Sequence, residues 1–242
     1  MTRDNRDPIT EIFAARARDL TPASARHVAH VLYAPVSPDP DVTRHCATVL
    51  SDTELQRADR FVADYDKAQF NQRRAFRRFC GAAALGSSKP LSQIEFKETA
   101  NGRPYLPDLP DVCFSFSSCR FGLLGAWSST HGIGVDLEDQ TRNLEAVELA
   151  HRYFLQAEAN AVEGVRGLAR MRTFFQYWSL KEAALKSIGE GLPFGLDAFE
   201  FELGPNLSVV QAPPDHGGPE RFVAHMIEGT DSCAAIVIRS LA

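Results

Sequence analysis

The segment Gly134-Val135-Asp136-Leu137-Glu138 alternates apolar residues with small or acidic ones. A period of two is typical of a β-strand with one apolar face, so Asp136 and Glu138 are predicted to point the same way. They lie two residues of about 3.3 Å each apart along the strand, and carboxylates this close repel each other unless a cation or water screens them. A hard divalent ion is their natural partner.

A second segment, WSLKEAALK at positions 178–186, carries its charged residues on a predicted helix. Apolar residues recur through it at helical spacing, and glycines follow its end. Trp178, Glu182 and Lys186 are four residues apart and therefore lie along one stripe, with Lys181 beside them. Taken alone, such a helix is most simply a solvated Glu182–Lys186 ion pair over a core tryptophan.

The two segments together resemble the signature of the 4'-phosphopantetheinyl transferases, G-[IV]-D-x-E followed by W-S-x-K-E-[AS]-x-x-K. Both parts of the signature are matched without a gap. The resemblance implies that Asp136, Glu138 and Glu182 bind Mg²⁺, with Mn²⁺ as an alternative, on the pyrophosphate of coenzyme A. It also implies that Lys181 and Lys186 lie against the phosphates of coenzyme A.

The resemblance further implies an enzyme with holo-[acyl-carrier-protein] synthase activity. Such an enzyme moves the 4'-phosphopantetheine arm of coenzyme A onto a serine of an apo acyl or peptidyl carrier protein and releases adenosine 3',5'-bisphosphate. Glu182, or a water that it shares with the metal, is the expected base for the serine proton. Lys181 and Lys186 are expected to take part in catalysis by stabilising the leaving phosphate.

Two other functions are consistent with parts of the sequence. A metal-dependent nuclease can be built from an Asp followed by a Glu and a Lys, but such sites usually place their E-x-K on a strand, whereas Glu182 is predicted on a helix. DNA cleavage with Mg²⁺ would support the nuclease. A non-catalytic module that binds coenzyme A or a carrier protein is the other alternative, and binding without turnover would identify it.

Composition and charge limit the class of protein. The 242 residues are 44% hydrophobic and 24% charged, as in ordinary globular proteins. A net charge of −5 and a pI near 5.8 argue against a nucleic-acid-coating role. The five cysteines form no C-x-x-C pair, which favours a reducing cytoplasm over a disulfide framework or a zinc site. Because the sequence shows neither a secretory signal nor a transmembrane run, we expect a cytoplasmic protein without membrane or nucleic-acid partners.

The order of predicted elements indicates an α+β fold, because helix-rich segments are followed by hairpin-rich segments twice. We expect an N-terminal extension at 1–26 with a short amphipathic helix from Ile9, an N-terminal half at 27–130, and a C-terminal half at 131–242 that carries the metal site. The resemblance implies two similar α+β halves of antiparallel sheets and packed helices, related by a pseudo-twofold axis with a cleft between them. It implies a monomer, as in the surfactin-synthetase-activating type.

The N-terminal half is predicted to open with a strand at 27–36 and a helix from Asp41. Ser51 and Glu54 have the spacing of a capping box. In this motif the side chain of each residue accepts a hydrogen bond from the backbone N–H of the other. That box predicts a helix that ends near Phe61.

A longer helix predicted at 66–85 carries a dense basic cluster. Its arginines are Arg73, Arg74, Arg77 and Arg78. Such a cluster is either a solvated face with salt bridges or a surface that binds phosphate, to which arginine donates two hydrogen bonds at once. In the resembling family, basic residues of this region bind the phosphate-bearing adenosine end of coenzyme A, so we take Arg74 and Arg78 as candidate contacts.

Asn101-Gly102 predicts a tight hairpin between two short extended segments. The following Arg103 resembles the basic residue of the family's G-[KR]-P-x-[LI] element, which contacts a phosphate of coenzyme A. The alternative is an ordinary turn residue. Further on, the segment 121–128 is strand-like, and the short turn at 129–132 predicts that it pairs antiparallel with the strand of Asp136.

The strand at 112–117 ends where the sequence departs from the family pattern. FSFSSC at 114–119 stands in place of the usual F-N-x-S-H-S, which puts Ser118 at the position of a histidine that contacts coenzyme A. Ser117 and Ser118 are therefore candidate coenzyme contacts. His131 is offset in sequence, and we interpret it as a turn residue.

Helices are predicted at 144–154 and 157–170, and Glu158 resembles the last residue of the family's R-[FY]-F-x-x-x-E element. A closing antiparallel sheet is predicted from the apolar or alternating segments after Gly191. Those segments are 199–203, 207–211, 222–227 and 234–239.

Overall fold

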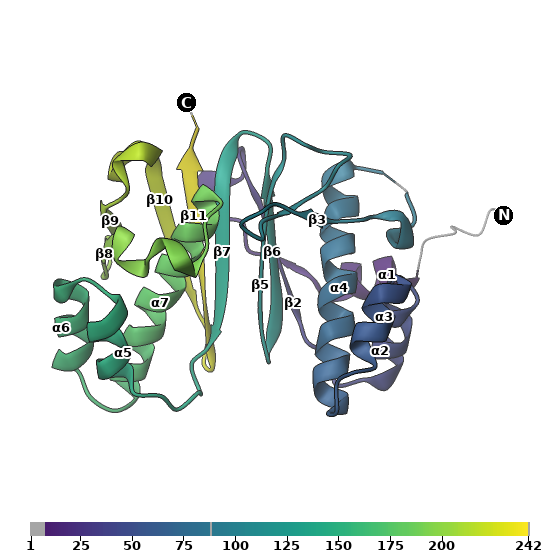
Figure 1. Ribbon diagram of the computed structural model, residues 1–242, viewed down its shortest axis with the longest axis horizontal. Coiled ribbons are helices and arrows are strands. Elements are labelled where there is room, and N and C mark those ends of the chain that lie inside the picture. The colour runs from purple at the N-terminus through teal and green to yellow at the C-terminus, as the bar shows by residue number, and fades with distance from the viewer. Residues whose placement is uncertain (1–7, 88, 242) are drawn as a thin grey trace.

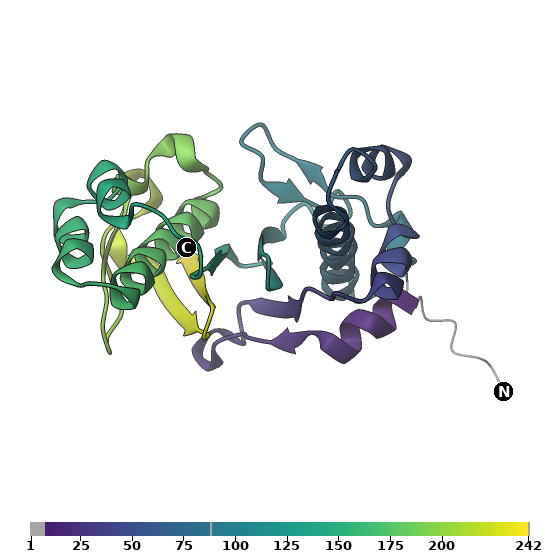
Figure 2. The same ribbon diagram turned by 90° about the horizontal axis from the view of Figure 1, so that it is seen from below.

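The computed structural model of the protein describes residues 8–87 and 89–241. Two antiparallel sheets lie between two groups of helices (Figure 1). The sheets meet along β5 (Cys113–Cys119) and β7 (His131–Asp139) and diverge away from these strands (Figure 2). The predicted α+β class with antiparallel sheets is confirmed.

The first sheet has the strand order β1-β2-β6-β5, and helices cover its outer face. A two-stranded hairpin, β3–β4, extends beside it. The remaining elements of this half are α1 (Pro8–Arg16), β1 (Arg18–Asp19), β2 (His30–Pro35), α2 (Pro40–Ala47), α3 (Asp52–Ala58), α4 (Asp64–Leu85), β3 (Lys97–Glu98), β4 (Pro104–Tyr105) and β6 (Gly122–Ser128).

The second sheet has the strand order β10-β11-β7, and α7 packs across it. A second small hairpin, β8–β9, lies at its outer side. This half contains α5 (Ala146–Tyr153), α6 (Gln156–Gly164), α7 (Leu168–Ile188), β8 (Glu200–Glu202), β9 (Ser208–Gln211), β10 (Phe222–Glu228) and β11 (Ser232–Ser240). Short 3₁₀ turns are η1 (Ala23–Ala25), η2 (Leu91–Gln93), η3 (Leu192–Phe194), η4 (Leu196–Ala198), η5 (Pro214–His216) and η6 (Pro219–Arg221).

Buried apolar side chains fill three spaces within the described residues. One cluster, which includes Phe76, lies between the first sheet and its helices, and another, which includes Phe174, lies between the second sheet and its helices. The third cluster lies between the two sheets and contains Leu124 and Val135. The apolar face of β7 is thus buried against the first sheet, as its alternating sequence predicts.

Several local predictions are confirmed. The hydroxyl of Ser51 accepts a hydrogen bond from the backbone N–H of Glu54, and the carboxylate of Glu54 accepts one from the backbone N–H of Ser51, so the capping box forms. The helix that it starts, α3, ends at Ala58 rather than near Phe61. The hairpin turns at Gly102, where φ is +78°, a value that glycine adopts without a steric penalty. The predicted N-terminal amphipathic helix is α1, whose Phe13 is buried in the core of the first half.

Three predictions of secondary structure or strand pairing are wrong. The four segments after Gly191 do not form one closing sheet: β8 and β9 form a separate hairpin, whereas β10 and β11 join β7. β6 does not pair with β7: β6 lies between β2 and β5 in the first sheet, while β7 pairs with β11 in the second. The chain changes sheets at this turn, because β7 packs its apolar face against the first sheet instead of pairing with β6 as a further strand of that sheet. The helix predicted at 157–170 ends at Gly164, and the chain restarts as α7 after Gly167, whose φ of +60° breaks the helix.

In residues 8–87 and 89–241, each helix is too short or too polar to cross a lipid bilayer.

Close packing of α7 on β7 depends on a glycine in the strand. A Cβ at Gly134 would lie 1.8 Å from the backbone oxygen of Ala183 in α7. Because side chains alternate along a strand, Asp136 and Glu138 follow Gly134 on this same face. The helix therefore lies directly over the strand, and its Lys186 comes within reach of the carboxylates.

We predict that Gly134→Ala lowers the free energy of unfolding by about 3 kcal/mol, because the new methyl group must displace the backbone of α7. Gly164→Ala is the matched control, since a Cβ there meets no described heavy atom within 4 Å. The control should leave stability unchanged or raise it by about 0.5 kcal/mol. Urea unfolding of both variants measures the difference, and equal midpoints would contradict the close contact.

Candidate functional site

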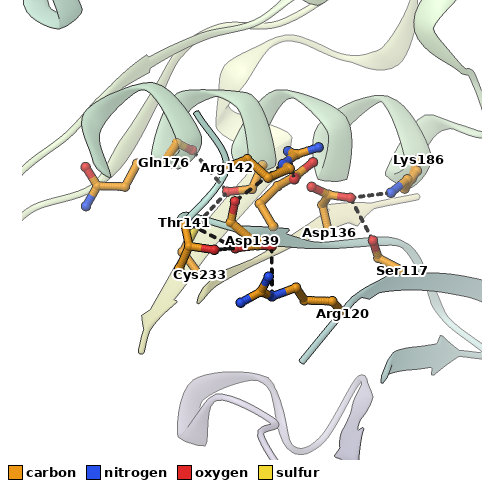
Figure 3. A network of polar contacts seen from close by, with 11 residues as sticks. Ser117, Arg120, Asp136, Asp139, Thr141, Arg142, Gln176, Lys186 and Cys233 are labelled. Carbon is orange, nitrogen blue, oxygen red and sulfur yellow. Dashed lines mark hydrogen bonds and ion pairs between the residues drawn. The ribbon is translucent and has the colours of Figure 1, made fainter. Parts of the chain in front are cut away.

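Asp136 is the centre of a polar cluster between β7 and α7. Its side chain is buried, and Oδ1 accepts from Lys186 Nζ at 2.6 Å and from Ser117 Oγ at 2.9 Å (Figure 3). Oδ2 is also buried and has no hydrogen-bond partner in the described part of the chain. One oxygen of a buried carboxylate is therefore open to a further ligand.

The two other predicted acidic residues lie beside Asp136, each near a cation. Glu138 pairs with Arg142, whose guanidinium lies 4.9 Å from the ring centre of Phe175. Glu182 Oε2 is 3.9 Å from Lys186 Nζ. The structure thus brings together Asp136, Glu138, Glu182 and Lys186, as the two sequence motifs predict.

The end of β7 is tied to the first half by a second polar group. Asp139 accepts from the backbone N–H and the hydroxyl of Thr141 and pairs with Arg120 Nε at 3.4 Å (Figure 3). Arg120 lies in the turn between β5 and β6. This contact fixes the acidic strand against the neighbouring sheet.

Burial and mutual repulsion affect the protonation of the cluster. Burial and the Asp136 carboxylate raise the pKa of Glu138 to about 7, against the opposing effect of Arg142. Burial also raises the pKa of Glu182, although Lys186 opposes it. For Lys186, burial alone would lower the pKa, but Asp136 and Glu182 outweigh it and raise the pKa. The ammonium of Lys186 is therefore charged at neutral pH.

The carboxylate oxygens of the cluster are ligands of the type that a hard cation binds, but their present arrangement does not form a complete metal site. Across the described residues, no three His, Cys, Asp or Glu side chains converge as a ready metal-binding group. Lys186 and Arg142 instead neutralise the carboxylates. The buried Oδ2 of Asp136, without a partner among residues 8–87 and 89–241, is nevertheless the kind of oxygen ligand that Mg²⁺ takes, and Glu138 and Glu182 lie next to it.

Two pockets lie close together, since Arg77 and Phe116 line both; the first is lined by residues of both halves and the second by residues of the first half. Pocket A, of about 200 Å³, is bounded by the β3–β4 hairpin and β5 on one side and by the end of α7 on the other. Pocket B, of about 250 Å³, lies between α4 and β5. Pocket A is lined by Arg77, Asn101, Gly102, Arg103, Pro104, Phe114, Ser115, Phe116, Glu182, Lys186, Gly189, Glu190 and Gly191, and pocket B by Arg73, Phe76, Arg77, Phe116, Ser117, Ser118, Leu123 and Leu124.

Arginine N–H groups in these pockets are available to a ligand. Arg77 lines both pockets, and its Nε is buried without a partner among the residues that the structure describes. The same holds for Nη2 of Arg103 in pocket A. Burial and the neighbouring Arg74 and Arg73 lower the pKa of Arg77 to about 10, against the opposing effect of Glu98, whose Oε1 lies 3.8 Å from Arg77 Nη1, so Arg77 remains charged at neutral pH. Both side chains are suited to bind an anion.

The structure corrects the choice of arginines within α4. Arg78 donates to Glu54 at 2.7 Å, and Arg74 Nε lies 3.5 Å from the same carboxylate. These two side chains therefore point toward α3 and line neither pocket, whereas Arg73 and Arg77 do. The signal in the sequence was Glu54, which its capping-box position holds against one side of α4.

Lys181 is also placed differently from its prediction. Its side chain is fully buried, and its ammonium contacts Glu158 Oε2 at 2.6 Å and the backbone oxygens of Leu196 and Phe199. Burial raises the pKa of Glu158 and lowers that of Lys181, because desolvation outweighs their attraction. Lys181 thus anchors α7 to α6 inside the second half and does not reach the cleft.

Neighbouring residues of β5 face opposite ways. Ser117 points toward β7 and donates to Asp136. Ser118 lines pocket B beside Arg73 and Arg77. Ser115, which the sequence analysis did not select, accepts from the backbone N–H of Val135 at 3.0 Å and so links the two sheets.

Known proteins with similar sequences share one description. The model of the 4'-phosphopantetheinyl transferase superfamily matches residues 132–235. Slr0495 of Synechocystis sp., provisionally named a 4'-phosphopantetheinyl transferase, is 33% identical over 70% of this chain and 68% of its own. The 4'-phosphopantetheinyl transferase HetI of Nostoc sp. is 30% identical over 73% of this chain and 74% of its own. The 4'-phosphopantetheinyl transferase Sfp of Bacillus subtilis is 32% identical over 53% of this chain and 56% of its own.

We predict that Lys181→Met destabilises the protein by about 3–5 kcal/mol, because it leaves the buried carboxylate of Glu158 without its cation. Adding Glu158→Gln should restore part of the lost stability, since it removes the uncompensated charge but keeps an acceptor for only one of the backbone N–H groups of Leu155 and Phe201. Urea unfolding of the single and double variants tests this pair. A loss below about 1 kcal/mol in the single variant would show that the ion pair is not what holds α6 to α7.

Proposed function

The chain belongs to the 4'-phosphopantetheinyl transferase superfamily, and from this premise we propose that it transfers the 4'-phosphopantetheine moiety of coenzyme A to a serine of an apo acyl or peptidyl carrier protein. Adenosine 3',5'-bisphosphate is the other product. The observation that carries the proposal is the buried Asp136 carboxylate, which shares Lys186 with Glu182 at the wall of a pocket rich in unpaired arginine N–H groups. Such a site combines a place for a cation with donors for phosphate oxygens.

Phosphate binding falls to the arginines and to Lys186. Arg77 and Arg103 offer buried N–H donors in the lining of pocket A, and hydrogen bonds from a charged donor to a phosphate are among the strongest in proteins. Lys186 keeps its charge next to Asp136. We assign it the stabilisation of negative charge that develops on the leaving phosphate.

Asp136, together with Glu138 and Glu182, would hold Mg²⁺ or Mn²⁺. When bound, the cation would neutralise charge on the pyrophosphate of coenzyme A. Ser117 fixes the orientation of Asp136 through its hydrogen bond to Oδ1, which leaves Oδ2 free to serve as the ligand.

Glu182 is our candidate for the group that accepts the proton of the serine hydroxyl. Its carboxylate lines pocket A one helical turn from Lys186. A carboxylate there lies in the pocket proposed for coenzyme A, where it could take the proton from a serine hydroxyl that attacks the phosphorus as the bond to the leaving phosphate breaks.

The remaining expectations belong to the same proposal. The enzyme acts as a monomer in the cytoplasm, without nucleic acid or membrane as a partner, and its two halves meet near residue 130. The helix α1 and strand β1 of the extension predicted at 1–26 pack with the first half. A binding module without turnover is the alternative. A nuclease has less support, because Glu182 lies on α7 and not on a strand.

The decisive experiment incubates the protein with coenzyme A, Mg²⁺ and a panel of apo carrier proteins, and measures carrier mass. We predict that the parent adds the mass of phosphopantetheine and that Asp136→Ala does not, because it loses a cation ligand while removing little core volume. Calorimetry should show Mg²⁺ strengthening coenzyme A binding in the parent only.

Glu11→Ala is the matched control, since Glu11 is exposed on α1, which lines neither pocket, and should retain activity. Circular dichroism of both variants checks the fold. Near-normal turnover by Asp136→Ala would refute the site, and a parent that modifies no carrier but binds coenzyme A would favour the binding module.

Ser118→His tests pocket B as the site of the 3'-phosphate of coenzyme A. Ser118 offers a neutral donor beside Arg73 and Arg77, and histidine could add a charge-assisted hydrogen bond. Such a bond is worth about 1.5–3 kcal/mol, so KM for coenzyme A should fall by roughly one to two orders of magnitude. KM for 3'-dephospho-coenzyme A should hardly change. Equal effects on both substrates would mean that Ser118 does not face the 3'-phosphate.

A further inference from the structure

A group of basic side chains flanks the C-terminal end of α7. Arg239 in β11 is the cross-strand partner of Gly132, and a Cβ at Gly132 would lie 3.3 Å from Arg239 Nε and 2.5 Å from the backbone oxygen of Ser187. Arg103 reaches the same helix end from the β3–β4 hairpin, because its Nη1 would lie 3.0 Å from a Cβ at Gly189. The two guanidinium groups thus belong to opposite halves of the molecule and meet at one place.

Two more donors come from the turn before β10. Arg221 immediately precedes Phe222, the other cross-strand partner of Arg239, and its Nε would lie 2.5 Å from a Cβ at Gly217. Arg239 Nη1 contacts His216 Nδ1 at 2.7 Å. Since a guanidinium can only donate, Nδ1 accepts and neutral His216 carries its proton on Nε2.

Counter-charge is missing from this group. None of Arg103, Arg221 and Arg239 forms an ion pair within residues 8–87 and 89–241. Arg239 Nε and Arg103 Nη2 are buried without a hydrogen-bond partner in that part of the chain. Burial, then Arg103 and Arg221, lower the pKa of Arg239, so each of these two arginines lies close enough to repel the charge of Arg239.

The end of α7 does not balance these charges. A helix C-terminus carries about half an elementary negative charge, against three guanidinium groups here. Glu190, in the loop that follows α7, accepts from Asn101 Nδ2 at 3.2 Å, and neither Glu190 nor Glu220 forms an ion pair with these arginines within the described residues. An external anion would supply both the charge and the acceptors that the chain lacks.

We propose that Arg103, Arg221, Arg239 and His216 form a second anion site that binds a phosphate group, separate from the carboxylates of β7. Guanidinium groups match phosphate oxygens with paired hydrogen bonds, and three of them from different elements can surround a tetrahedral anion. Because Arg103 also lines pocket A, the site adjoins the proposed coenzyme pocket. Its occupant is either free phosphate or a phosphate of a ligand that extends from pocket A.

The test measures melting temperature and calorimetric affinity with millimolar inorganic phosphate, against potassium chloride of equal ionic strength. Phosphate should raise the melting temperature of the parent by about 4 °C. In Arg221→Gln and Arg239→Gln the affinity for phosphate should fall about tenfold or more. Arg172→Gln, which changes an exposed arginine near the start of α7, is the matched control and should behave as the parent.

Coenzyme A binding to the same variants identifies the source of the phosphate. If Arg221→Gln binds coenzyme A with an affinity within about twofold of the parent, the site takes free phosphate. A loss of about tenfold in that affinity assigns the site to a phosphate of coenzyme A. Both readouts are independent of turnover, so they stand if no carrier protein is modified. The proposal is overturned if phosphate has no effect on the parent beyond that of chloride, or if Arg172→Gln loses as much affinity as Arg221→Gln. If Arg239→Gln does not fold, Arg221→Gln decides.

Discussion

The contact between Asp136 and Lys186 is the interaction on which the cleft depends. Three carboxylates share a small, partly buried space, and without the ammonium 2.6 Å from Asp136 their repulsion would oppose folding. Gly134 allows this contact, because any side chain there would push α7 away from β7. A strand glycine, a strand acid and a helix lysine thus act as one structural unit.

The two halves meet through side chains as well as through a shared apolar core. β5 and β7 run past each other without a backbone ladder, and Ser115 bonds to the backbone of β7 where a ladder would otherwise do so. Ser117, also in β5, donates a hydrogen bond to the carboxylate of Asp136 in β7. A junction of this kind leaves room beside it: pocket A lies between the β3–β4 hairpin, β5 and the end of α7, and pocket B adjoins it between α4 and β5.

The charges of the cleft are distributed by element. The acids come from β7 and α7, and the unpaired arginine donors come from α4 and the β3–β4 hairpin. Bringing the halves together therefore places phosphate-binding groups opposite cation-binding groups. Substrate binding in the cleft would in turn lower the repulsion within each set, so the free protein is expected to be less stable than the complex.

The sequence alone determined the local elements and the residues of the acidic cluster. Alternation placed Asp136 and Glu138 on one face, helical spacing aligned Glu182 with Lys186, and the capping box of Ser51 set the start of α3. Only the tertiary structure decided which neighbouring element each side of a helix contacts. Lys181 is one residue, or about 100°, from Glu182 around α7, enough to turn it from the cleft to the buried Glu158, and Arg74 and Arg78 turn to Glu54 in the same way. The partner of β7 was decided at the same level, because strand pairing depends on which faces are buried together and not on the length of a turn.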